Sequence, residues 1–349
     1  MKRVAFAIPG DLESPTGGYG YDRRMIAELR RLDWQVDVIA LGDGFPRPTD
    51  AKRAHALELL DSVPDGVPIL IDGLAFGVLP EAASFLRTPH RLIALVHHPL
   101  ALETGISQNE ATSLRASERT ALQSSWHVVV TSATTRRILI DDYEIAASKI
   151  SIARPGTERV LVEPRARNDI VQLISVGSIV PRKGYDVLIA ALAQLKGLAW
   201  HLSIVGDPAF SPDTTTALHA GIVRNAMTDK VSVLGRVSGA HLSALYASSD
   251  VFVLASHFEG YGMAYAEAIA HGLPVVGTAG GAIPEVVTGG AGLLVPPGDV
   301  AALAAALRTT IEDADQRRRL TEAARLTASN LPTWQESART LSNAIEAAL

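Results

Sequence analysis

Two glutamates stand eight positions apart in a glycine-rich segment, residues 255–268. Glu259 directly precedes Gly260 and Gly262, and Glu267 lies in the apolar stretch that follows them. Glycines at the start of a helix let a ligand approach free backbone N–H groups, which favour an anion such as phosphate. Carboxylate oxygens accept hydrogen bonds from hydroxyl groups. The segment therefore suits a ligand with a diphosphate between two sets of hydroxyls, as in a nucleotide sugar, although two solvated glutamates would give the same pattern.

Two adjacent cations, Arg182 and Lys183, follow the apolar run of residues 171–176 and precede Gly184. An arginine binds phosphate through two parallel N–H bonds, and a lysine adds a compact positive charge. Because a strand is expected before them and a helix after them, the pair predicts a clamp for a diphosphate. The alternative is a solvated surface pair, which is usual for Arg-Lys in isolation.

A glycine-rich segment of the N-terminal half, residues 16–22, follows the first apolar run. It indicates either a loop whose backbone approaches a ligand or a flexible surface turn. Arg23 stands where the dinucleotide-binding pattern G-x-G-x-x-G needs its third glycine, so a dehydrogenase is disfavoured.

Two further patterns suggest metal binding, but their surroundings do not support it. His97 and His98 end an apolar run, and adjacent residues of a strand point to opposite faces, so they are poorly placed to chelate one ion. Asp313 and Asp315 spell D-x-D, a motif that binds metal in other proteins. They lie between two polar helical stretches, which favours a solvated connector.

Short apolar runs alternate with helical patterns along the chain, and the candidate residues follow the runs. The runs predict strands of sheets covered on both faces, because they are apolar almost throughout. Strands are expected at residues 4–8, 36–41, 69–72, 92–97, 128–131, 171–176, 202–205, 231–234, 251–254, 274–276 and 293–295. Helices are expected at residues 21–32, 110–123, 186–195, 240–247, 264–270 and 300–311, among others. The alternation predicts parallel sheets with right-handed crossovers.

The two series of strands predict two α/β domains, each a Rossmann-like, doubly wound parallel sheet, since 349 residues exceed one ordinary domain. We expect one domain over residues 1–160 and another over residues 161–331, joined within residues 154–169. Residues 332–349 form a last amphipathic helix. Ligands of such sheets bind beyond the carboxyl ends of the strands, so the two domains are expected to face a central cleft.

Composition excludes several classes of protein. A formal net charge of −5 argues against a nucleic-acid partner, and the absence of cysteine excludes disulfides, Cys-based zinc sites and a thiol nucleophile. No apolar run approaches the length of a membrane-spanning helix, and the first run is too short for a signal peptide. A cytoplasmic protein is therefore expected. Four arginines of an early helix would permit peripheral contact with anionic lipid, or would form a solvated face: Arg23, Arg24, Arg30 and Arg31.

Glu259 and Glu267 have the E-x7-E spacing of family 4 retaining glycosyltransferases of the GT-B fold, and neighbouring residues extend the similarity. The C-terminal half resembles this family throughout, and the N-terminal half resembles it more loosely. The other matching segments are Gly235-Arg236-Val237, Asp250-Val251-Phe252-Val253, Gly272-Leu273-Pro274-Val275-Val276, Gly280-Gly281, Pro284-Glu285 and Gly292-Leu293-Leu294-Val295-Pro296-Pro297-Gly298-Asp299.

The resemblance implies a metal-independent hexosyltransferase that requires no cofactor. Its donor would be a UDP or GDP type of nucleotide sugar, its acceptor an unidentified hydroxyl compound (a small molecule, lipid or saccharide), and its product an α-glycoside. Residues 161–331 would bind the donor and residues 1–160 the acceptor. The last helix, from about Trp334, would pack back on the first domain.

The resemblance also implies roles for single residues. Lys183 matches the family's diphosphate lysine, whereas Ser178 occupies the position of the usual arginine, which Arg182 would replace. The catalytic residues would be His98, Glu259, Lys183 and Arg182. Donor contacts would come from Gly17, Gly18, Gly177, Arg182, Lys183, Val237, Glu259, Gly260, Tyr261, Gly262, Met263 and Glu267. Acceptor-side candidates are Tyr19, Tyr21, His97 and Glu103.

Three alternatives remain open at this point. A sugar-nucleotide epimerase would have the same fold, and a non-catalytic protein would bind the nucleotide sugar without turnover. A nicotinamide dehydrogenase would explain the parallel sheets but not the two glutamates.

Overall fold

The computed structural model describes residues 2–160 and 169–349, and the chain divides into two compact units. Unit 1 comprises Met1–Gly156 together with Pro332–Leu349, and unit 2 comprises Thr157–Leu331. The expected boundary at 160/161 adjoins residues 161–168, which lie outside the described residues. Among the described helices, none has both the length and the apolar character needed to cross a bilayer.

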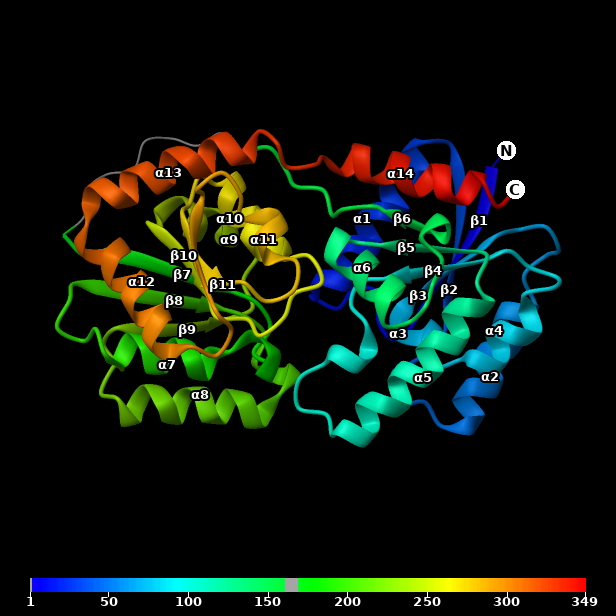
Figure 1. Ribbon diagram of the computed structural model, residues 1–349, viewed down its shortest axis with the longest axis horizontal. Helices are drawn as coiled ribbons and strands as arrows, with labels where there is room; N and C mark the ends of the chain where they lie inside the picture. The colour runs from blue at the N-terminus through cyan, green and yellow to red at the C-terminus, as the bar shows by residue number, and fades with distance from the viewer. Residues whose placement is uncertain (1, 161–168) are drawn as a thin grey trace. The chain divides into compact units, whose positions relative to one another are not determined.

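Unit 1 is built on a parallel sheet whose described strands have the order β2-β1-β3-β4-β5-β6 (Figure 1). The strands are β1 (Lys2–Ile8), β2 (Trp34–Ala40), β3 (Ile69–Asp72), β4 (Leu92–Val96), β5 (His127–Val130) and β6 (Ile150–Ile152). The order reverses next to β1, because β2 lies on one side of it and β3 on the other. Such a reversal is the switch point at which doubly wound sheets bind ligands.

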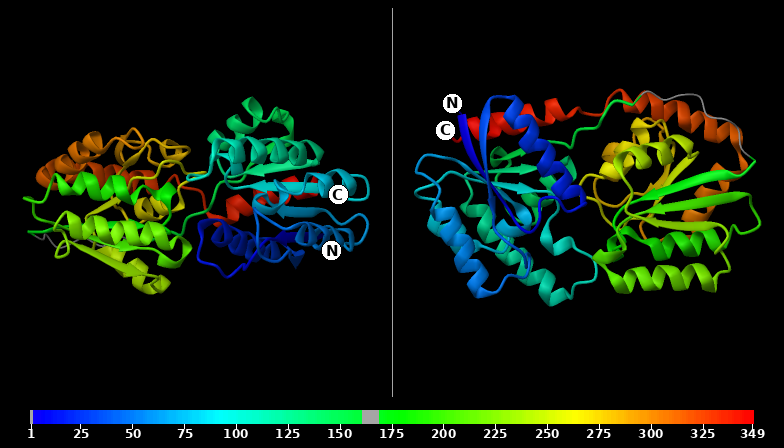
Figure 2. Two further views of the ribbon diagram at one scale, coloured as in Figure 1. Left: turned by 90° about the horizontal axis from the view of Figure 1, so that it is seen from below. Right: turned by 180° about the vertical axis from the view of Figure 1, so that it is seen from behind.

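Helices cover both faces of this sheet, which explains the unbroken apolar strands. The helices of unit 1 are α1 (Gly17–Arg31), α2 (Asp50–Asp61), α3 (Gly73–Phe76), α4 (Pro80–Leu86), α5 (Gln108–Ser124), α6 (Ala133–Asp141) and α14 (Trp334–Glu346), with short 3-10 turns η1 (Leu100–Leu102) and η2 (Ala147–Lys149). Alternate strand residues such as Ile69, Ile71 and Val128 share one core with buried residues of α2, α4, α5 and α6. Helices α1 and α14 lie side by side in Figures 1 and 2.

The last helix, α14, is an integral part of unit 1. Trp334 packs edge-on against Tyr21 of α1, with ring centroids 6.0 Å apart, and the indole N–H of Trp34 donates to the hydroxyl of Ser342 at 2.9 Å. The backbone of Trp334 also runs against Gly156, where an added Cβ would lie 2.2 Å from the Trp334 nitrogen. The place where the chain leaves unit 1 and the place where it returns are therefore neighbours.

Unit 2 repeats the architecture, with the described strands in the order β12-β11-β10-β7-β8-β9. They are β7 (Val171–Val176), β8 (Trp200–Val205), β9 (Val231–Gly235), β10 (Val251–Leu254), β11 (Val275–Thr278) and β12 (Gly292–Val295). The helices and turns are η3 (Pro181–Lys183), α7 (Tyr185–Ala193), η4 (Pro208–Phe210), α8 (Pro212–Arg224), α9 (Gly239–Ser248), α10 (Met263–Ala270), α11 (Ile283–Val286), α12 (Val300–Glu312) and α13 (Ala314–Ala328). In Figure 1, α7 and α8 lie along one side of this sheet and α10 and α13 along the other.

The predicted α/β class and the eleven expected strands are confirmed, with small differences at their ends. The prediction was wrong in two places of unit 1. It had no strand at β6, whose three residues are too few to form a recognisable apolar run. It also had a loop at residues 16–22, whereas α1 begins at Gly17. The hydroxyl of Thr16 accepts the N–H of Tyr19 and caps the helix there, so the glycines form its first turn.

One buried carboxyl group of unit 1 makes stability depend on pH. Glu118 of α5 is almost fully buried, and its Oε2 accepts the N–H of Leu100 at 3.0 Å. Burial raises the pKa of Glu118 from 4.5 to about 8, although the hydrogen bond from Leu100 opposes the shift. Between these values the folded state holds one proton more than the unfolded state. The free energy of unfolding therefore falls as the pH rises, by roughly 1.4 kcal/mol per pH unit for one proton.

Replacing Glu118 with glutamine is expected to remove this dependence, so the variant should gain stability relative to the wild type between pH 5 and pH 8. Urea unfolding of both proteins at several pH values measures the difference. Two curves of stability against pH that run parallel would contradict the prediction.

Candidate functional site

Arg182, Lys183 and Glu259 meet at the carboxyl end of the sheet of unit 2. The Lys183 ammonium lies 2.6 Å from Oε1 of Glu259, and an Arg182 guanidinium nitrogen lies 3.3 Å from Oε2. The hydroxyl of Ser256 donates to Oε1 at 2.6 Å. We call these four residues the cation–carboxylate cluster. Burial alone would raise the pKa of Glu259, but the charges of Lys183 and Arg182 outweigh it and lower that pKa to about 2.

The loops that hold the cluster pack backbone against backbone. Strands β7 and β10 are neighbours in the sheet, so the loops after them lie side by side. Gly184 has φ +62°, and a Cβ there would lie 2.1 Å from the carbonyl oxygen of Ala255. A Cβ at Gly281 would likewise lie 2.3 Å from the carbonyl oxygen of Glu259. Glycine is therefore required where these loops touch, which fixes Glu259 against the two cations.

Arg182 also ties the two loops together through its backbone and side chain. Its guanidinium donates to the carbonyl oxygen of Phe258 at 2.9 Å, and its own carbonyl accepts the N–H of His257 at 2.8 Å. Lys183 extends back over Gly177, where an added Cβ would lie 3.2 Å from its Cε. Ser178 follows Gly177 and is partly buried. That Arg182 replaces the arginine missing at Ser178 stays a prediction.

The segment between Glu259 and α10 contains the other predicted donor contacts of this region. Gly260, Tyr261 and Gly262 are buried, and Gly262 adopts φ +104° at the start of α10. The helix begins at Met263, one residue before the expected start at residue 264. Val237 is partly buried and follows β9.

Glu267, the second glutamate of the pair, lies within α10 and is partly buried. Its Oε2 accepts the hydroxyl of Tyr246 at 3.4 Å. The ring of Tyr246 in turn stacks on His271 at a centroid distance of 4.7 Å. Glu267 thus has its own polar surroundings, separate from the cations that bind Glu259.

In unit 1, His97 directly follows β4 and lies between two buried aspartates, one in α1 and one at the end of β3. Its Nε2 is 3.0 Å from Oδ1 of Asp22, in α1, and 3.4 Å from Oδ2 of Asp72, the last residue of β3. We call these residues the Asp–His–Asp cluster. Burial alone would lower the pKa of His97, but the two carboxylates outweigh it and raise that pKa to about 10. Burial raises the pKa of Asp22 to about 7, with His97 opposing the shift.

The sequence-based interpretation missed both aspartates. Asp72 is a polar residue at the end of an apolar run, and the same pattern drew attention to His97. Asp22 lies within a helix, where no sequence pattern distinguishes it from other polar residues. Gly18 lies next to the imidazole, since an added Cβ would be 3.6 Å from its Cδ2. Gly17, the first residue of α1, is exposed.

The remaining acceptor-side candidates are Tyr19 and Tyr21, which lie near His97, and Glu103, which lies near the catalytic candidate His98. The hydroxyl of Tyr21 donates to a backbone carbonyl at 3.0 Å, and its ring meets that of His97 edge-on with centroids 5.1 Å apart. Burial, then the charges of the neighbouring aspartates, raise the pKa of Tyr19 to about 12. His98 is apart from this group, and its Nε2 lies 3.9 Å from a carboxylate oxygen of the half-exposed Glu103.

Most of the early arginines contribute to folding contacts. Arg23 donates to the carbonyls of Leu12 and Ser14, and Arg30 donates to that of Val36 at 3.2 Å. The Arg24 guanidinium lies over the Trp334 ring, 5.8 Å from its centroid, and Arg31 pairs with Glu28.

The two aspartates of the D-x-D motif make contacts that stabilise helix α13. Asp313 caps the N-terminus of α13 by accepting the N–H of Gln316 at 2.8 Å, and Asp315 pairs with Arg318 in the next turn. Both aspartates are exposed, as expected for a connector.

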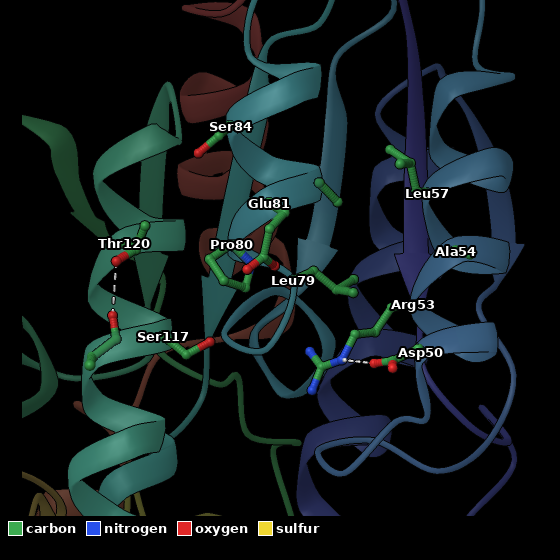
Figure 3. Close-up of a pocket in the computed structure, with 12 residues that line it drawn as sticks. Asp50, Arg53, Ala54, Leu57, Leu79, Pro80, Glu81, Ser84, Ser117 and Thr120 are labelled. Atoms are coloured by element: carbon green, nitrogen blue, oxygen red, sulfur yellow. Dashed lines mark hydrogen bonds and ion pairs between the residues drawn. The ribbon is translucent and has the colours of Figure 1, made fainter.

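A groove of about 1050 Å³ lies on the outer helical layer of unit 1, between α2, α4 and α5 (Figure 3). Arg53 and Asp50 approach each other there at 4.0 Å. None of the residues that line this groove belongs to either cluster, so it is separate from the candidate site.

Part of the chain matches a known protein family, and several individual proteins are similar to it in sequence. Residues 160–327 match the family described as Glycosyl transferases group 1. The chain is 29% identical over 264 residues to an MMP alpha-(1->4)-mannosyltransferase of Mycolicibacterium hassiacum, covering 71% of this chain and 63% of that protein. It is 32% identical over 227 residues to a D-inositol 3-phosphate glycosyltransferase of Kineococcus radiotolerans, covering 57% of this chain and 52% of that protein. The chain thus spans 52–63% of the length of these two relatives.

Solved structures with the same architecture cover nearly the whole chain. A sucrose-phosphate synthase from Thermosynechococcus elongatus has a TM-score of 0.85 at 21% identity, with 99% of both chains covered. Anabaena HepE in complex with UDP and glucose has a TM-score of 0.79 at 21% identity, covering 99% of this chain and all of HepE. These likenesses confirm the GT-B fold. The match over residues 160–327 makes this part of the chain similar to the Glycosyl transferases group 1 family.

Proposed function

We propose that the chain is a metal-independent, retaining glycosyltransferase that moves a hexose from a nucleoside diphosphate to a hydroxyl acceptor. The cation–carboxylate cluster is the observation on which this proposal depends. Unit 2 would bind the donor, and unit 1 would supply the acceptor side. A UDP sugar is the first donor to test, because the HepE structures contain UDP, glucose and UDP-glucose.

The charges of the cluster suit the departure of a diphosphate. When the bond between the anomeric carbon and the diphosphate oxygen breaks, its electron pair stays on the diphosphate. Lys183 and Arg182 would stabilise that charge, assisted by backbone N–H groups before α10. Glu259, kept ionised by the same cations, would accept hydrogen bonds from hydroxyls of the sugar. The acceptor oxygen would then bond to the anomeric carbon and transfer its proton to the departing diphosphate oxygen.

The properties of Glu259 agree with retention of configuration. An inverting enzyme needs a base on the acceptor side, opposite the leaving group. Glu259 belongs to the proposed donor side and has a pKa of about 2, so it is a poor base. His98 would brace the transferred sugar. Because two cations and a helix start already face the leaving group, we propose that metal is not needed.

Transfer from an α-linked donor is therefore expected to give an α-glycoside, at the same rate with and without EDTA. A panel of nucleotide sugars assayed for nucleotide release identifies the donor, and proton NMR of the first-formed product gives its anomeric configuration. A β-linked product from an α-linked donor would exclude retention. Loss of activity in EDTA that magnesium or manganese restores would exclude the metal-free mechanism.

A further inference from the structure

The Asp–His–Asp cluster joins three ionisable groups at one point of unit 1. Asp22 is fully buried and Asp72 nearly so, whereas the side chain of His97 keeps 20% of its exposure. Both carboxylates approach the same ring nitrogen, Nε2, which leaves Nδ1 of His97 for a ligand. In the described part of the chain, neither aspartate has an ion pair with a lysine or arginine, and Oδ2 of Asp22 has no hydrogen-bond partner.

The groups packed around the imidazole do not supply another positive charge. Tyr21 of α1 contacts the ring, and Tyr19 of the same helix stays neutral near physiological pH because of its raised pKa. From β3 comes Asp72, and from the segment after β5 the hydroxyl of Thr131 donates to the backbone carbonyl of His97. The net charge of the cluster therefore depends only on the protonation states of Asp22, Asp72 and His97.

The charge balance favours a protonated imidazole. With His97 neutral, two carboxylates would be buried with a net charge of −2, and unpaired buried charge is costly. A proton on His97 reduces the net charge to −1, makes the contact with Asp22 a charge-assisted hydrogen bond, and makes the contact with Asp72 an ion pair. The raised pKa of His97 agrees with this argument.

We propose that Asp22 and Asp72 are positioning residues that hold His97 as an imidazolium, so that His97 serves the transfer as a fixed cation and hydrogen-bond donor and not as a base. The inference rests on the proposed function and deepens it. The Nδ1–H group would donate to an oxygen of the bound substrate. Since an imidazolium cannot accept the acceptor's proton, the inference also supports a retaining mechanism.

Nitrogen NMR of the full chain labelled with 15N-histidine tests the protonation state without an activity assay. Replacing His97 with glutamine identifies its signals. At pH 7.5 they should have the imidazolium pattern, and Asp22→Asn should lower the titration midpoint by about 1–2 pH units, the effect of losing one neighbouring opposite charge. Asp72→Asn repeats the test if Asp22→Asn folds poorly. Tyr21→Phe, which keeps the ring contact and all charges of the cluster, should leave the midpoint unchanged.

A neutral imidazole at pH 7.5 in the wild type would overturn the proposal. So would a large change in the His97 signals on adding Mg²⁺ or Zn²⁺, because that change would assign the cluster to a metal. In Asp22→Asn, turnover should fall as the pH rises through the lowered midpoint, whereas wild-type turnover should show no such loss. A protein with the imidazolium signature and no transferase activity would refute the proposed function and leave the protonation state established.

Discussion

Glu259→Gln is expected to reduce turnover by roughly 10²–10³-fold, the loss typical when one preorganised electrostatic group is removed. Glutamine has nearly the same size, but it cannot bind sugar hydroxyls with a charged oxygen. Affinity for the bare nucleoside diphosphate should hold or improve, because Lys183 and Arg182 would no longer be neutralised by Glu259 at 2.6 and 3.3 Å. Steady-state kinetics measures the first effect and calorimetry the second.

Glu267→Ala provides the matched comparison on the same segment. It should weaken binding of the bare nucleotide by about 1–3 kcal/mol, through loss of a charged hydrogen bond to the ribose. Glu322→Ala, at an exposed position of α13, is the control and should change neither quantity. Loss of nucleotide affinity in Glu259→Gln but not in Glu267→Ala would mean that the two roles are reversed.

Lys183→Ala is expected to weaken binding of a nucleoside diphosphate by about 10–100-fold while binding of the nucleoside alone barely changes. The reason is the loss of a charge-assisted contact to phosphate, worth roughly 1.5–3 kcal/mol. Lys183→Arg should recover part of the affinity. Lys196→Ala, on an exposed residue of unit 2, controls for the change in net charge.

Arg182→Ala tests whether Arg182 fills the place of the arginine missing at Ser178. A loss similar to that of Lys183→Ala would support this replacement. Unchanged diphosphate affinity would leave Lys183 and backbone amides as the clamp, and Arg182 as the residue that holds the Phe258 loop through its 2.9 Å hydrogen bond. Thermal unfolding of each variant separates lost binding from lost folding.

Most of the fold could be predicted because strands and helices are specified by short stretches of sequence. A strand buried on both faces has to be apolar throughout, and each such run was visible in the sequence except β6. At Ile150–Ile152 only three residues pair with β5, so no run was long enough to recognise. The start of α1 was misplaced because three glycines suggested a loop, whereas the cap from Thr16 is sufficient to begin a helix.

The contacts within the site could not be predicted, because they depend on which strands are neighbours. Glu259 and Lys183 were assigned to different parts of the donor, and their pairing follows from the adjacency of β7 and β10. Asp72 meets His97 because β3 lies beside β4 in register. Strand order is a tertiary property, so the residues at the strand ends were found by sequence while most of their partners were not.

The contact between Gly156 and Trp334 has a consequence for the order in which the protein is made. Unit 2 leaves and rejoins unit 1 at neighbouring points, so it is an insertion into a domain that α14 completes. On the ribosome, all of unit 2 emerges before α14 does. Unit 2 can therefore acquire its full core during synthesis, whereas the face of unit 1 that Trp334 covers must wait for α14. Of the two units, the one whose translation starts first is the one that is completed second.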